Sequence, residues 1–514
     1  VLKCARQIIS DPLAKILNIS IEQGIYPQKL KIAKIIPIFK CDDETDPNNY
    51  RPISLLSIFN KLFEKIMYKK LKSFLDINGI ICDSQYGFRE KHSTEHAILD
   101  IVNQIQTNMD KRLFSCGVFF DLRKAFNTVD HNILLAKLNH YGIRGVINQW
   151  FASYLKGRLQ TTEIKNSISS KQETLCGVPQ GSVLGPLLFL LYINDICKSS
   201  SILQFFLFAD DTNLLYADKS LRSLEKVLNR ELTHVSDWLI ANRLTLNIKK
   251  SNYVIFRPPQ KKIDYKPVIK LLDNNSQLMI SLEYKDCVKY LGVLIDSHLS
   301  WKQHIDHIAL KISKSVGLIS KVRHFLPFHI LANLYQSLIL PYLSYSVVVW
   351  GRAANSHLNK LLILQKRVLR LMNFAQSQQH AVPFFLSSNF LPIHMIYFQR
   401  TANLMYDISN GVSPILIQNL FKKSNYVHNY STRSASRGEF YVKSSRTEIQ
   451  KHSFSRSGTT IWNSLPQNLR NESKKNFKYN LQSLLRNILE TEDDYINVPE
   501  IITLLPKYKY SLRT

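Results

Sequence analysis

The chain has 514 residues, of which 45% are hydrophobic and 11% aromatic, so it exceeds one small domain and can form packed cores in two to four lobes. Its formal charge of +28 predicts a polyanionic partner, since Lys and Arg gain affinity by releasing counterions from phosphates. No apolar run reaches the about 20 residues that span a bilayer. Seven scattered cysteines without a CxxC pair exclude a disulfide framework and fit reduced intracellular thiols.

Basic helices alternate with short strands in the first 110 residues. The stretch from Leu55 to Leu75 places lysines among apolar residues at helical spacing, and this predicts an amphipathic helix. The apolar residues in question are Phe59, Leu62, Phe63, Ile66 and Met67. A solvated face is the simplest explanation of the lysines.

Three carboxylates follow apolar runs that predict buried strands. Asp121 ends the run of residues 116–120. Asp210 and Asp211 lie between two apolar runs within residues 206–215, where they predict a turn between two strands. Asp is common in turns, so the pair taken alone also fits a structural role.

Burying hydrophobic strands beside like charges is costly unless a positive group neutralises them. A strand-end Asp121 and the pair Asp210 and Asp211 on a neighbouring hairpin could converge on two Mg²⁺ ions. Such ions lie about 3.5–4 Å apart and clamp the attacking and leaving oxygens of a phosphoryl transfer. Magnesium suits the arrangement because it prefers carboxylate and phosphate oxygens.

A Gly- and Pro-rich loop lies between the two acidic segments, at residues 177–186. Its backbone can approach a ligand closely, although such loops are common in proteins. It leads into a predicted helix from Leu187 to Ile196. An earlier helix follows Asp121, and either Asp130 or Asn132 is expected to cap it.

These motifs, in this order, resemble the reverse transcriptases of non-LTR retrotransposons of the LINE, jockey-like type. The resemblance covers nearly the whole chain, and the order of the motifs argues against coincidence. The matching segments are residues 34–40, 50–56 and 85–89, then motif A at 121–126, motif B at 179–181, motif C at 208–211, motif D at 246–251, and motif E at 289–293 with Trp301 and His304.

The resemblance implies that Asp121, Asp210 and Asp211 are the catalytic residues and bind two Mg²⁺ ions, for which Mn²⁺ is a substitute. It also implies a role for Phe126, five residues after Asp121. In the family the matching aromatic residue packs under the sugar of the incoming nucleotide and excludes a 2′-hydroxyl. Phe126 therefore favours DNA synthesis, while a core aromatic residue is the alternative interpretation.

Other basic and loop residues are candidate contacts to substrate. Arg51 and Lys40 are expected to grip the triphosphate, Arg51 through its planar guanidinium, unless they form a solvated basic loop. Arg89 is expected to touch either template or nucleotide. Gln180 and Gly181 are expected to contact the nucleotide and the template strand.

Lys250 is expected to protonate the departing pyrophosphate, with Lys249 as the alternative, and both also fit plain surface lysines. One residue departs from the family pattern. Asn127 stands where the family usually has Asp, at the end of motif A. Because this position is not a metal ligand, we expect tuning of activity rather than its loss.

The implied fold is α+β, a right-hand polymerase whose palm contains an antiparallel sheet. We expect a reverse transcriptase domain over residues 20–296, with helical fingers at about 20–110 and the palm at about 111–296. A helical, thumb-like region is expected at 297–373, followed by a basic, mainly helical C-terminal region at 374–514.

Basic charge is concentrated after the catalytic motifs, because residues 301–514 hold 27 Lys and Arg against 10 Asp and Glu. The segment 358–372 predicts a helix with a basic face that could lie against a duplex without reading its sequence. Residues 422–457 are expected to be a mobile RNA-binding segment, and ordered structure to return at 458–466. The acidic residues within 490–494 predict a solvated turn.

The expected partners are an RNA template, a DNA primer or nicked target DNA, and dNTPs, with no membrane partner and the oligomeric state left open. The chain opens with Val1, which suggests an N-terminally incomplete reading frame without the upstream endonuclease domain of related elements. Cytoplasmic ribonucleoprotein and nucleus are the expected locations. Two rival functions are a catalytically inactive, RNA-binding descendant and an RNA-synthesising polymerase.

Overall fold

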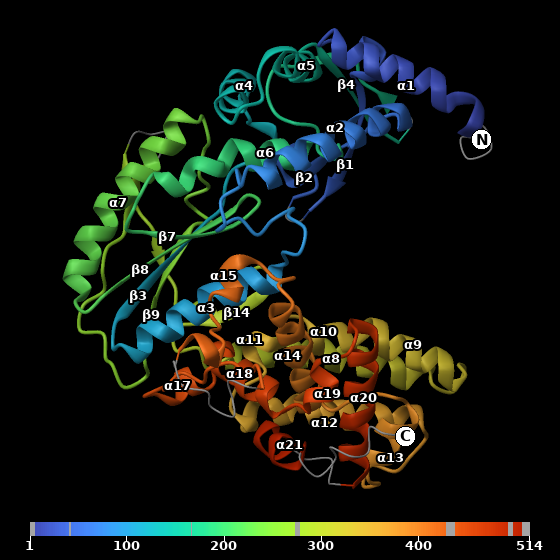
Figure 1. The fold of residues 1–514 in the computed structure, drawn as a ribbon, viewed down its shortest axis with the longest axis vertical. Helices are drawn as coiled ribbons and strands as arrows, with labels where there is room; N and C mark the ends of the chain where they lie inside the picture. Colours follow the sequence, from blue (N-terminus) through green and yellow to red (C-terminus); the bar gives the residue numbers. More distant parts are fainter. Residues whose placement is uncertain are drawn as a thin grey trace.

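The computed structural model describes residues 6–40, 43–165, 167–272, 278–427, 437–491 and 497–505. In Figure 1 the ribbon forms a crescent, with the N-terminal helices at one end, a sheet in the middle and a large helical body at the other end. Parts of two segments named above lie outside the described residues, namely residues 428–436 of the expected RNA-binding segment and residues 492–494 of the acidic turn. Among the described helices, none is both long and apolar enough to cross a bilayer.

The central sheet has five strands in the order β12-β9-β3-β8-β7. The pairs β3–β8, β3–β9 and β7–β8 are antiparallel, and β12 runs parallel to β9. The strands are β3 (Phe114–Phe120), β7 (Gln204–Phe208), β8 (Asp211–Asp218), β9 (Asn252–Phe256) and β12 (Glu283–Tyr284). The predicted strands on either side of the acidic pair are thus found as the hairpin β7–β8.

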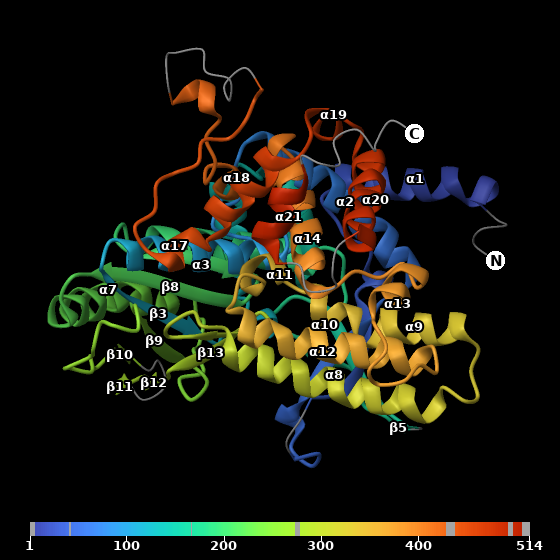
Figure 2. The same cartoon turned by 90° about the horizontal axis from the view of Figure 1, so that it is seen from below.

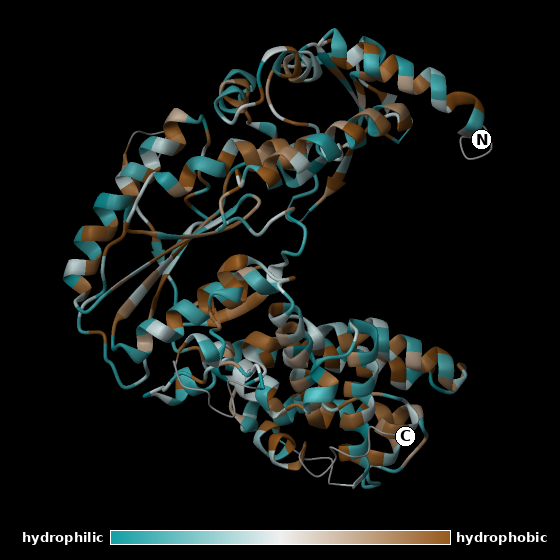
Figure 3. Cartoon of the chain, viewed as in Figure 1, coloured by the Kyte–Doolittle hydropathy of each residue, from teal (hydrophilic) through white to brown (hydrophobic). Residues whose placement is uncertain are grey.

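Both faces of this sheet are covered, which explains why every residue of β3 is buried and why its apolar residues do not alternate with exposed polar ones. Phe119 packs with α3 (Thr94–Asp110) on one face. Val118 and Phe120 pack on the other face with α6 (Gly185–Ile193) and α7 (Leu221–Ala241). Helix α7 is amphipathic, and its turns alternate between hydrophilic and hydrophobic colouring in Figure 3.

A second sheet forms the N-terminal lobe, in which β1 pairs antiparallel with β2 and parallel with β4. Its strands are β1 (Ile32–Phe39), β2 (Tyr50–Leu55), β4 (Arg158–Ile164), β5 (Ser167–Ile168) and β6 (Gln172–Thr174). The helices of this lobe are α1 (Arg6–Glu22), α2 (Ile58–Ile77), α4 (His131–His140) and α5 (Gly145–Leu155). Asp130, not Asn132, caps α4, because its carboxylate accepts the backbone N–H groups of Asn132 and Ile133.

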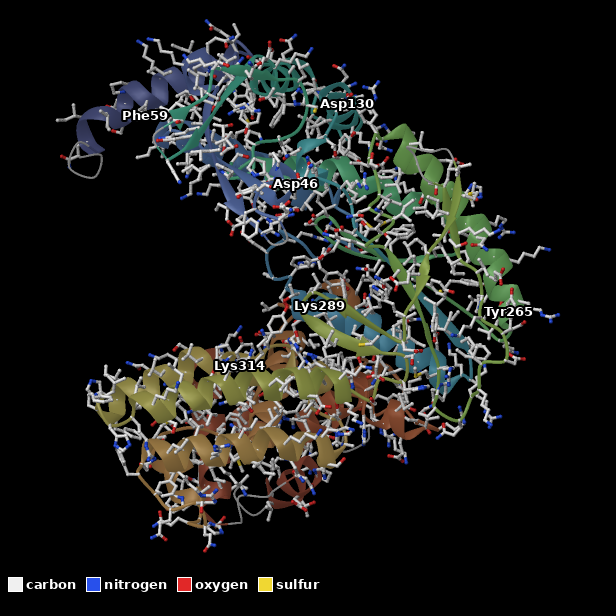
Figure 4. All side chains as sticks on the ribbon, turned by 180° about the vertical axis from the view of Figure 1, so that it is seen from behind. Asp46, Phe59, Asp130, Tyr265, Lys289 and Lys314 are labelled. Atoms are coloured by element: carbon white, nitrogen blue, oxygen red, sulfur yellow. The ribbon has the colours of Figure 1, made fainter. Side chains whose placement is uncertain are left out.

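Helix α2 confirms the predicted amphipathic helix but begins at Ile58, after the N-cap Ser57. Its buried face includes Phe63 and Met67. The other three apolar residues that define the predicted pattern, Phe59, Leu62 and Ile66, are 39–41% exposed. The helix presents one apolar row to the core and leaves a second row at the surface, and Phe59 is labelled on this outer side in Figure 4.

Helices dominate the chain after the hairpin of β13 (Cys287–Tyr290) and β14 (Val293–Asp296). A small hairpin of β10 (Lys270–Leu272) and β11 (Met279–Ser281) precedes it. The helices are α8 (Lys302–Val322), α9 (Phe328–Leu338), α10 (Leu340–Ser344), α11 (Val347–Trp350), α12 (Asn355–Met372), α13 (Val382–Ser387), α14 (Ile393–Ser409), α15 (Ile415–Gln418), α17 (Glu448–Lys451), α18 (Phe454–Ser464), α19 (Gln467–Arg470), α20 (Lys474–Thr491) and α21 (Val498–Leu504).

One hydrophobic core runs from α3 through α8, α12 and α14 to α21, so it is continuous across residue 373, where we expected the thumb-like region to end. Helix α14 is its centre, since 12 of its 17 residues are buried. Helix α17 lies beside α3 in both views of the ribbon (Figure 2). The Asp110 carboxylate accepts the backbone N–H and the hydroxyl of Thr447 there, at 2.9 and 2.8 Å.

The junction between α11 and α14 generates a stability prediction. A Cβ atom on Gly351 would lie 2.4 Å from Cδ2 of the buried Tyr397 and 2.6 Å from the Val347 carbonyl oxygen. Gly351→Ala should therefore lower the free energy of unfolding by about 1–3 kcal/mol. The matched control is Gly317→Ala within α8, where no atom lies within 4 Å of the added Cβ, and it should raise this free energy by about 0.5–1 kcal/mol. Urea denaturation of both variants measures the difference, and equal midpoints would contradict the packing argument.

Candidate active site

The three carboxylates meet at one edge of the central sheet. Phe120 pairs with Thr212 at the last register position of β3 and β8, so extending the ladder by one residue places Asp121 opposite Asp211. Asp210 lies in the turn of the β7–β8 hairpin, just after Ala209, which has a φ of 56°. The fold therefore brings together the three Asp residues that the sequence predicted to converge.

The carboxylates influence one another electrostatically. Burial, together with the smaller effects of the charges of Asp210 and Asp121, raises the pKa of Asp211 to about 6. Burial also raises the pKa of Asp210, with a smaller contribution from Asp121, while Arg51 and Lys40 act in the opposite direction. Negative charge at this edge is only partly compensated by protein cations, and this is the environment in which a divalent cation binds favourably.

The donor set fits Mg²⁺, because it consists of carboxylate oxygens from two adjacent strand ends. In the described part of the chain, no group of three or more His, Cys, Asp or Glu side chains is arranged so that it could hold a metal ion. The three Asp residues nevertheless share a sheet edge, and their charges act on one another.

Asn247 fixes the orientation of Asp121. Its side-chain Nδ2 donates to Oδ2 of Asp121 at 3.0 Å, and its backbone N–H donates to the Asp121 carbonyl oxygen at 2.7 Å. The Asp121 N–H donates to the Ser251 hydroxyl at 3.3 Å. The sequence places Asn247 inside motif D without a role. Its contact with Asp121 becomes visible only in the fold, where Leu246, the residue before it, forms a bridge with Leu122, the residue after Asp121.

Gln85 anchors the turn that carries Asp210 and Asp211. Its side-chain oxygen accepts the backbone N–H of Ala209 at 3.0 Å and that of Gly87 at 2.8 Å. The backbone beside it pairs with β7, where Leu207 donates to the Ser84 carbonyl oxygen at 2.9 Å. Motif 85–89 therefore supports motif C directly, which its spacing in the sequence does not indicate.

The motif B loop joins motif A to strand β2. The Val178 N–H donates to the Phe126 carbonyl oxygen at 2.8 Å, and Ser54 donates its N–H to the Gln180 carbonyl oxygen at 2.7 Å. Gly181 has a φ of 113°, and a Cβ there would lie 2.7 Å from the Ser54 carbonyl oxygen, so only glycine fits without strain. The loop is held on both sides.

Asn127 has a definite contact in this loop, because its Oδ1 accepts a hydrogen bond from Nε2 of Gln180 at 2.9 Å. An amide pair thus occupies the position where the family usually carries Asp. Phe126 is half-buried. It stacks on Phe189 with ring centroids 4.5 Å apart and meets Phe88 edge-on at 6.3 Å. The ring is held by aromatic neighbours beside the carboxylate edge.

The basic candidates differ in their surroundings. Arg51 and Lys40 are exposed near the end of the β1–β2 hairpin, and both act electrostatically on Asp210. Arg89 is half-buried, and its Nη1 donates to the carbonyl oxygens of Cys82 and Gln85 at 2.9 and 3.2 Å. Lys250 is exposed, and no described contact joins its ammonium to the carboxylates. The roles predicted for these side chains remain predictions.

The β1–β2 hairpin also touches the segment after Asp121. Nζ of Lys124 donates to Oδ1 of Asn48 at 2.8 Å. On the opposite side, the buried Tyr290 of β13 packs against Phe119 at 5.9 Å, and burial raises its pKa, with a further contribution from Asp211. Figure 4 labels one neighbour of each residue: Asp46, which accepts a hydrogen bond from Asn48, and Lys289, which precedes Tyr290 in the chain. The two labels lie on opposite sides of the concave edge of the ribbon.

Tyr345 is a positioning residue that no motif or spacing in the sequence indicates. Its hydroxyl donates to the Leu291 carbonyl oxygen at 2.6 Å, in the turn between β13 and β14. Its ring lies 3.3 Å from where a Cβ on Gly292 would stand. The helical body therefore holds the motif E turn next to the carboxylate edge, through a contact that spans more than 50 residues of sequence.

Comparison with known proteins identifies the family. Residues 39–295 match the family described as reverse transcriptase (RNA-dependent DNA polymerase). The chain belongs to the reverse transcriptase family. The predicted resemblance is thus confirmed, and so is the α+β, right-hand polymerase fold that it implied.

Two relatives are polymerases of mobile elements from Drosophila melanogaster. The RNA-directed DNA polymerase from mobile element jockey is 30% identical over 375 residues, which cover 71% of this chain and 40% of the relative. The probable RNA-directed DNA polymerase from transposon X-element is 29% identical over 377 residues, covering 70% and 39%. The chain therefore spans about two fifths of the length of these relatives. Apo telomerase from Candida tropicalis aligns at 11% identity over 74% of this chain and 66% of its own, with a TM-score of 0.39.

The electrostatics predict that Asp211 destabilises the metal-free protein. Its pKa in the folded state, about 6, lies above its ordinary value of 3.8, so stability falls as the pH rises through this interval. In EDTA at pH 7, Asp211→Asn should raise the free energy of unfolding by about 1–2 kcal/mol, a figure reduced for partial exposure to solvent. The gain should vanish near pH 4, where the aspartate is largely protonated.

Asp218→Asn at the other end of β8 is the matched control. The pKa of Asp218 is lowered by the Ser220 N–H and the Ser223 hydroxyl, which outweigh a raising effect of burial, so its substitution should not stabilise the protein at pH 7. Urea denaturation at both pH values, with EDTA and with Mg²⁺, measures the two variants. Mg²⁺ should stabilise the wild type more than Asp211→Asn, since only binding to the folded state shifts the equilibrium. Equal stabilisation of both would argue against a metal site at Asp211.

Proposed function

We propose that this chain is the RNA-directed DNA polymerase of a non-LTR retrotransposon. It would add deoxynucleotides from dNTPs to the 3′-hydroxyl of a DNA primer or nicked target DNA on an RNA template, and release pyrophosphate. The observation that carries the proposal is the convergence of Asp121, Asp210 and Asp211 at one sheet edge in a chain of the reverse transcriptase family. The names of the two Drosophila relatives support the template and product.

In this proposal Asp121, Asp210 and Asp211 hold two Mg²⁺ ions, with Mn²⁺ as a substitute. Bound there, the metals would lower the pKa of the primer hydroxyl and neutralise the triphosphate. Asn247 and Gln85 keep the carboxylate-bearing segments in place through amide contacts. Most of the catalysis of phosphoryl transfer comes from positioning and electrostatics, which are the contributions these residues make.

The proposed substrate contacts follow the same edge. Arg51 and Lys40 face the triphosphate from the β1–β2 hairpin, a role supported by their effect on Asp210. Gln180 and Gly181 contact nucleotide and template through the motif B loop. Two assignments rest on sequence alone, Arg89 to template or nucleotide and Lys250 to the pyrophosphate.

The proposed domains are fingers at about 20–110, a palm at about 111–296, a thumb-like region at 297–373 and a basic C-terminal region at 374–514. The net positive charge of the chain supports the binding of nucleic acid along these domains. A cytoplasmic ribonucleoprotein and the nucleus are the proposed locations. The second candidate function, an inactive RNA-binding descendant, is favoured by one residue, Asn127, in place of the family's Asp.

Primer extension tests the polymerase. On an RNA template annealed to a DNA primer, with Mg²⁺ and dNTPs, the wild type should extend the primer. The double variant Asp210→Asn/Asp211→Asn should lose activity by at least about 1,000-fold, because it removes the charge that holds the metals. Asp218→Asn, on the same strand β8, should keep it. No extension by the wild type together with tight, salt-sensitive RNA binding would favour the inactive descendant.

Phe126→Val tests the discrimination between sugars. Removing the ring should open space for a 2′-hydroxyl and raise the efficiency of rNTP use relative to dNTP use by about 10- to 100-fold. Phe189→Leu is the control, because Phe189 stacks on Phe126 and is itself buried. This control should change stability more than sugar selectivity. Equal use of rNTPs and dNTPs by the wild type would overturn the assignment of Phe126.

A further inference from the structure

Two cysteines from distant parts of the sequence lie side by side. Cys82 follows α2 in the connection toward motif 85–89, and Cys197 lies in the 3₁₀ helix Asn194–Lys198 after α6. Their sulfur atoms are 3.1 Å apart, although 115 residues separate them. Both are free thiols and both are partly accessible to solvent.

A single side chain, that of Asn194, holds the two segments together. Its Oδ1 accepts the backbone N–H of Cys82 at 2.8 Å, and its Nδ2 donates to the Ile80 carbonyl oxygen at 2.8 Å. Asn194 itself is buried at the start of the 3₁₀ helix that carries Cys197. The segment of Cys82 is therefore held to the 3₁₀ helix of Cys197 by two hydrogen bonds of the Asn194 side chain, so the closeness of the sulfurs does not depend on the cysteine rotamers alone.

The pair differs from the other described cysteines in reactivity. The hydrogen bond with Cys197 lowers the pKa of Cys82 to about 6, so a thiolate is present at neutral pH. Burial raises the pKa of Cys116, which is enclosed in the sheet. It also raises the pKa of Cys287, to about 11. Cys176 is exposed, but its sulfur contacts the Asn127 carbonyl oxygen at 3.3 Å and has no thiol partner among the described residues.

We propose that Cys82 and Cys197 form a modification site that takes a peroxide and closes an intramolecular disulfide. The Cys82 thiolate attacks one peroxide oxygen, the O–O bond breaks, and the sulfur becomes a sulfenic acid while hydroxide leaves and is protonated to water. The Cys197 sulfur then attacks the Cys82 sulfur. The S–O bond breaks, and the leaving hydroxide takes the Cys197 proton to form a second water. Two thiols are oxidised and one peroxide is reduced to two waters.

The disulfide would fasten the connection before motif 85–89 to the 3₁₀ helix after α6. Closing it moves the sulfurs from 3.1 Å to about 2.0 Å, a shift that two surface segments can share. The fastened connection ends three residues before Gln85, whose side chain anchors the turn of Asp210 and Asp211. The modification therefore acts on a segment that supports the active site without touching the carboxylates.

The test uses the purified full chain, graded hydrogen peroxide, alkylation of free thiols and mass spectrometry of the digested protein. The expected product is a linked peptide pair joining Cys82 to Cys197, with five of the seven thiols still alkylated. It should form at the same rate on dilution of the protein and disappear with dithiothreitol. The readout does not require polymerase activity, so its failure is distinct from failure of the proposed function.

Three serine variants complete the design. Cys197→Ser should form no link and should leave a sulfenic acid on Cys82 that dimedone traps. Cys82→Ser should leave Cys197 unmodified, and Cys176→Ser should behave as the wild type. Thermal unfolding of each variant checks that it is folded. Oxidation of the exposed Cys176 while Cys82 and Cys197 remain alkylated would overturn the proposal, as would a disulfide that joins either of them to another cysteine.

Discussion

Repulsion among three carboxylates at the edge of a buried sheet is the constraint on which the rest of the structure depends. The sheet is covered on both faces, so its strand ends lie in a poorly solvated environment. Each ionised carboxylate at these strand ends therefore raises the pKa of the carboxylates beside it. A protein could relieve this cost with an adjacent Arg or Lys, yet the cations that act on Asp210 are exposed ones on the separate β1–β2 hairpin. The uncompensated charge is the property that suits a site for metal and triphosphate.

Neutral amides do the positioning around this charge. Asn247 orients Asp121, Gln85 holds the Ala209 turn, and the Asn127–Gln180 pair ties motif A to motif B. A side-chain amide can donate and accept hydrogen bonds without adding a net charge, so it fixes geometry and leaves the net charge of the site to the carboxylates. Because Asn127 fills a place where the family usually has Asp, it extends the same pattern and removes one further negative charge from the edge.

Local patterns in the sequence predicted the elements that local chemistry determines. The strand ends at Asp121 and Asp211 follow from apolar runs, and the start of α4 follows from two residues that both favour a cap, of which the structure uses Asp130. The buried face of α2 could not be read from its apolar residues, because it has two apolar rows and only tertiary packing selects one.

The sequence patterns did not predict the contacts between distant segments. The hydrogen bonds from Asn247 to Asp121 and from Tyr345 to Leu291 join residues far apart in the chain, so the periodicity of the sequence does not indicate them. Family resemblance located the motifs, and only the fold revealed which residues support them.

The core that continues from α3 to α21 has a consequence for how this chain can change during evolution. Helix α3 lines the central sheet with one side and receives Thr447 at its last residue, Asp110. A recombination event that exchanged the C-terminal third for that of another family member would replace at once the C-terminal side chains that share a core with α3. Such swaps should succeed only between close relatives, so we expect the palm and the C-terminal helices to be inherited together as one unit.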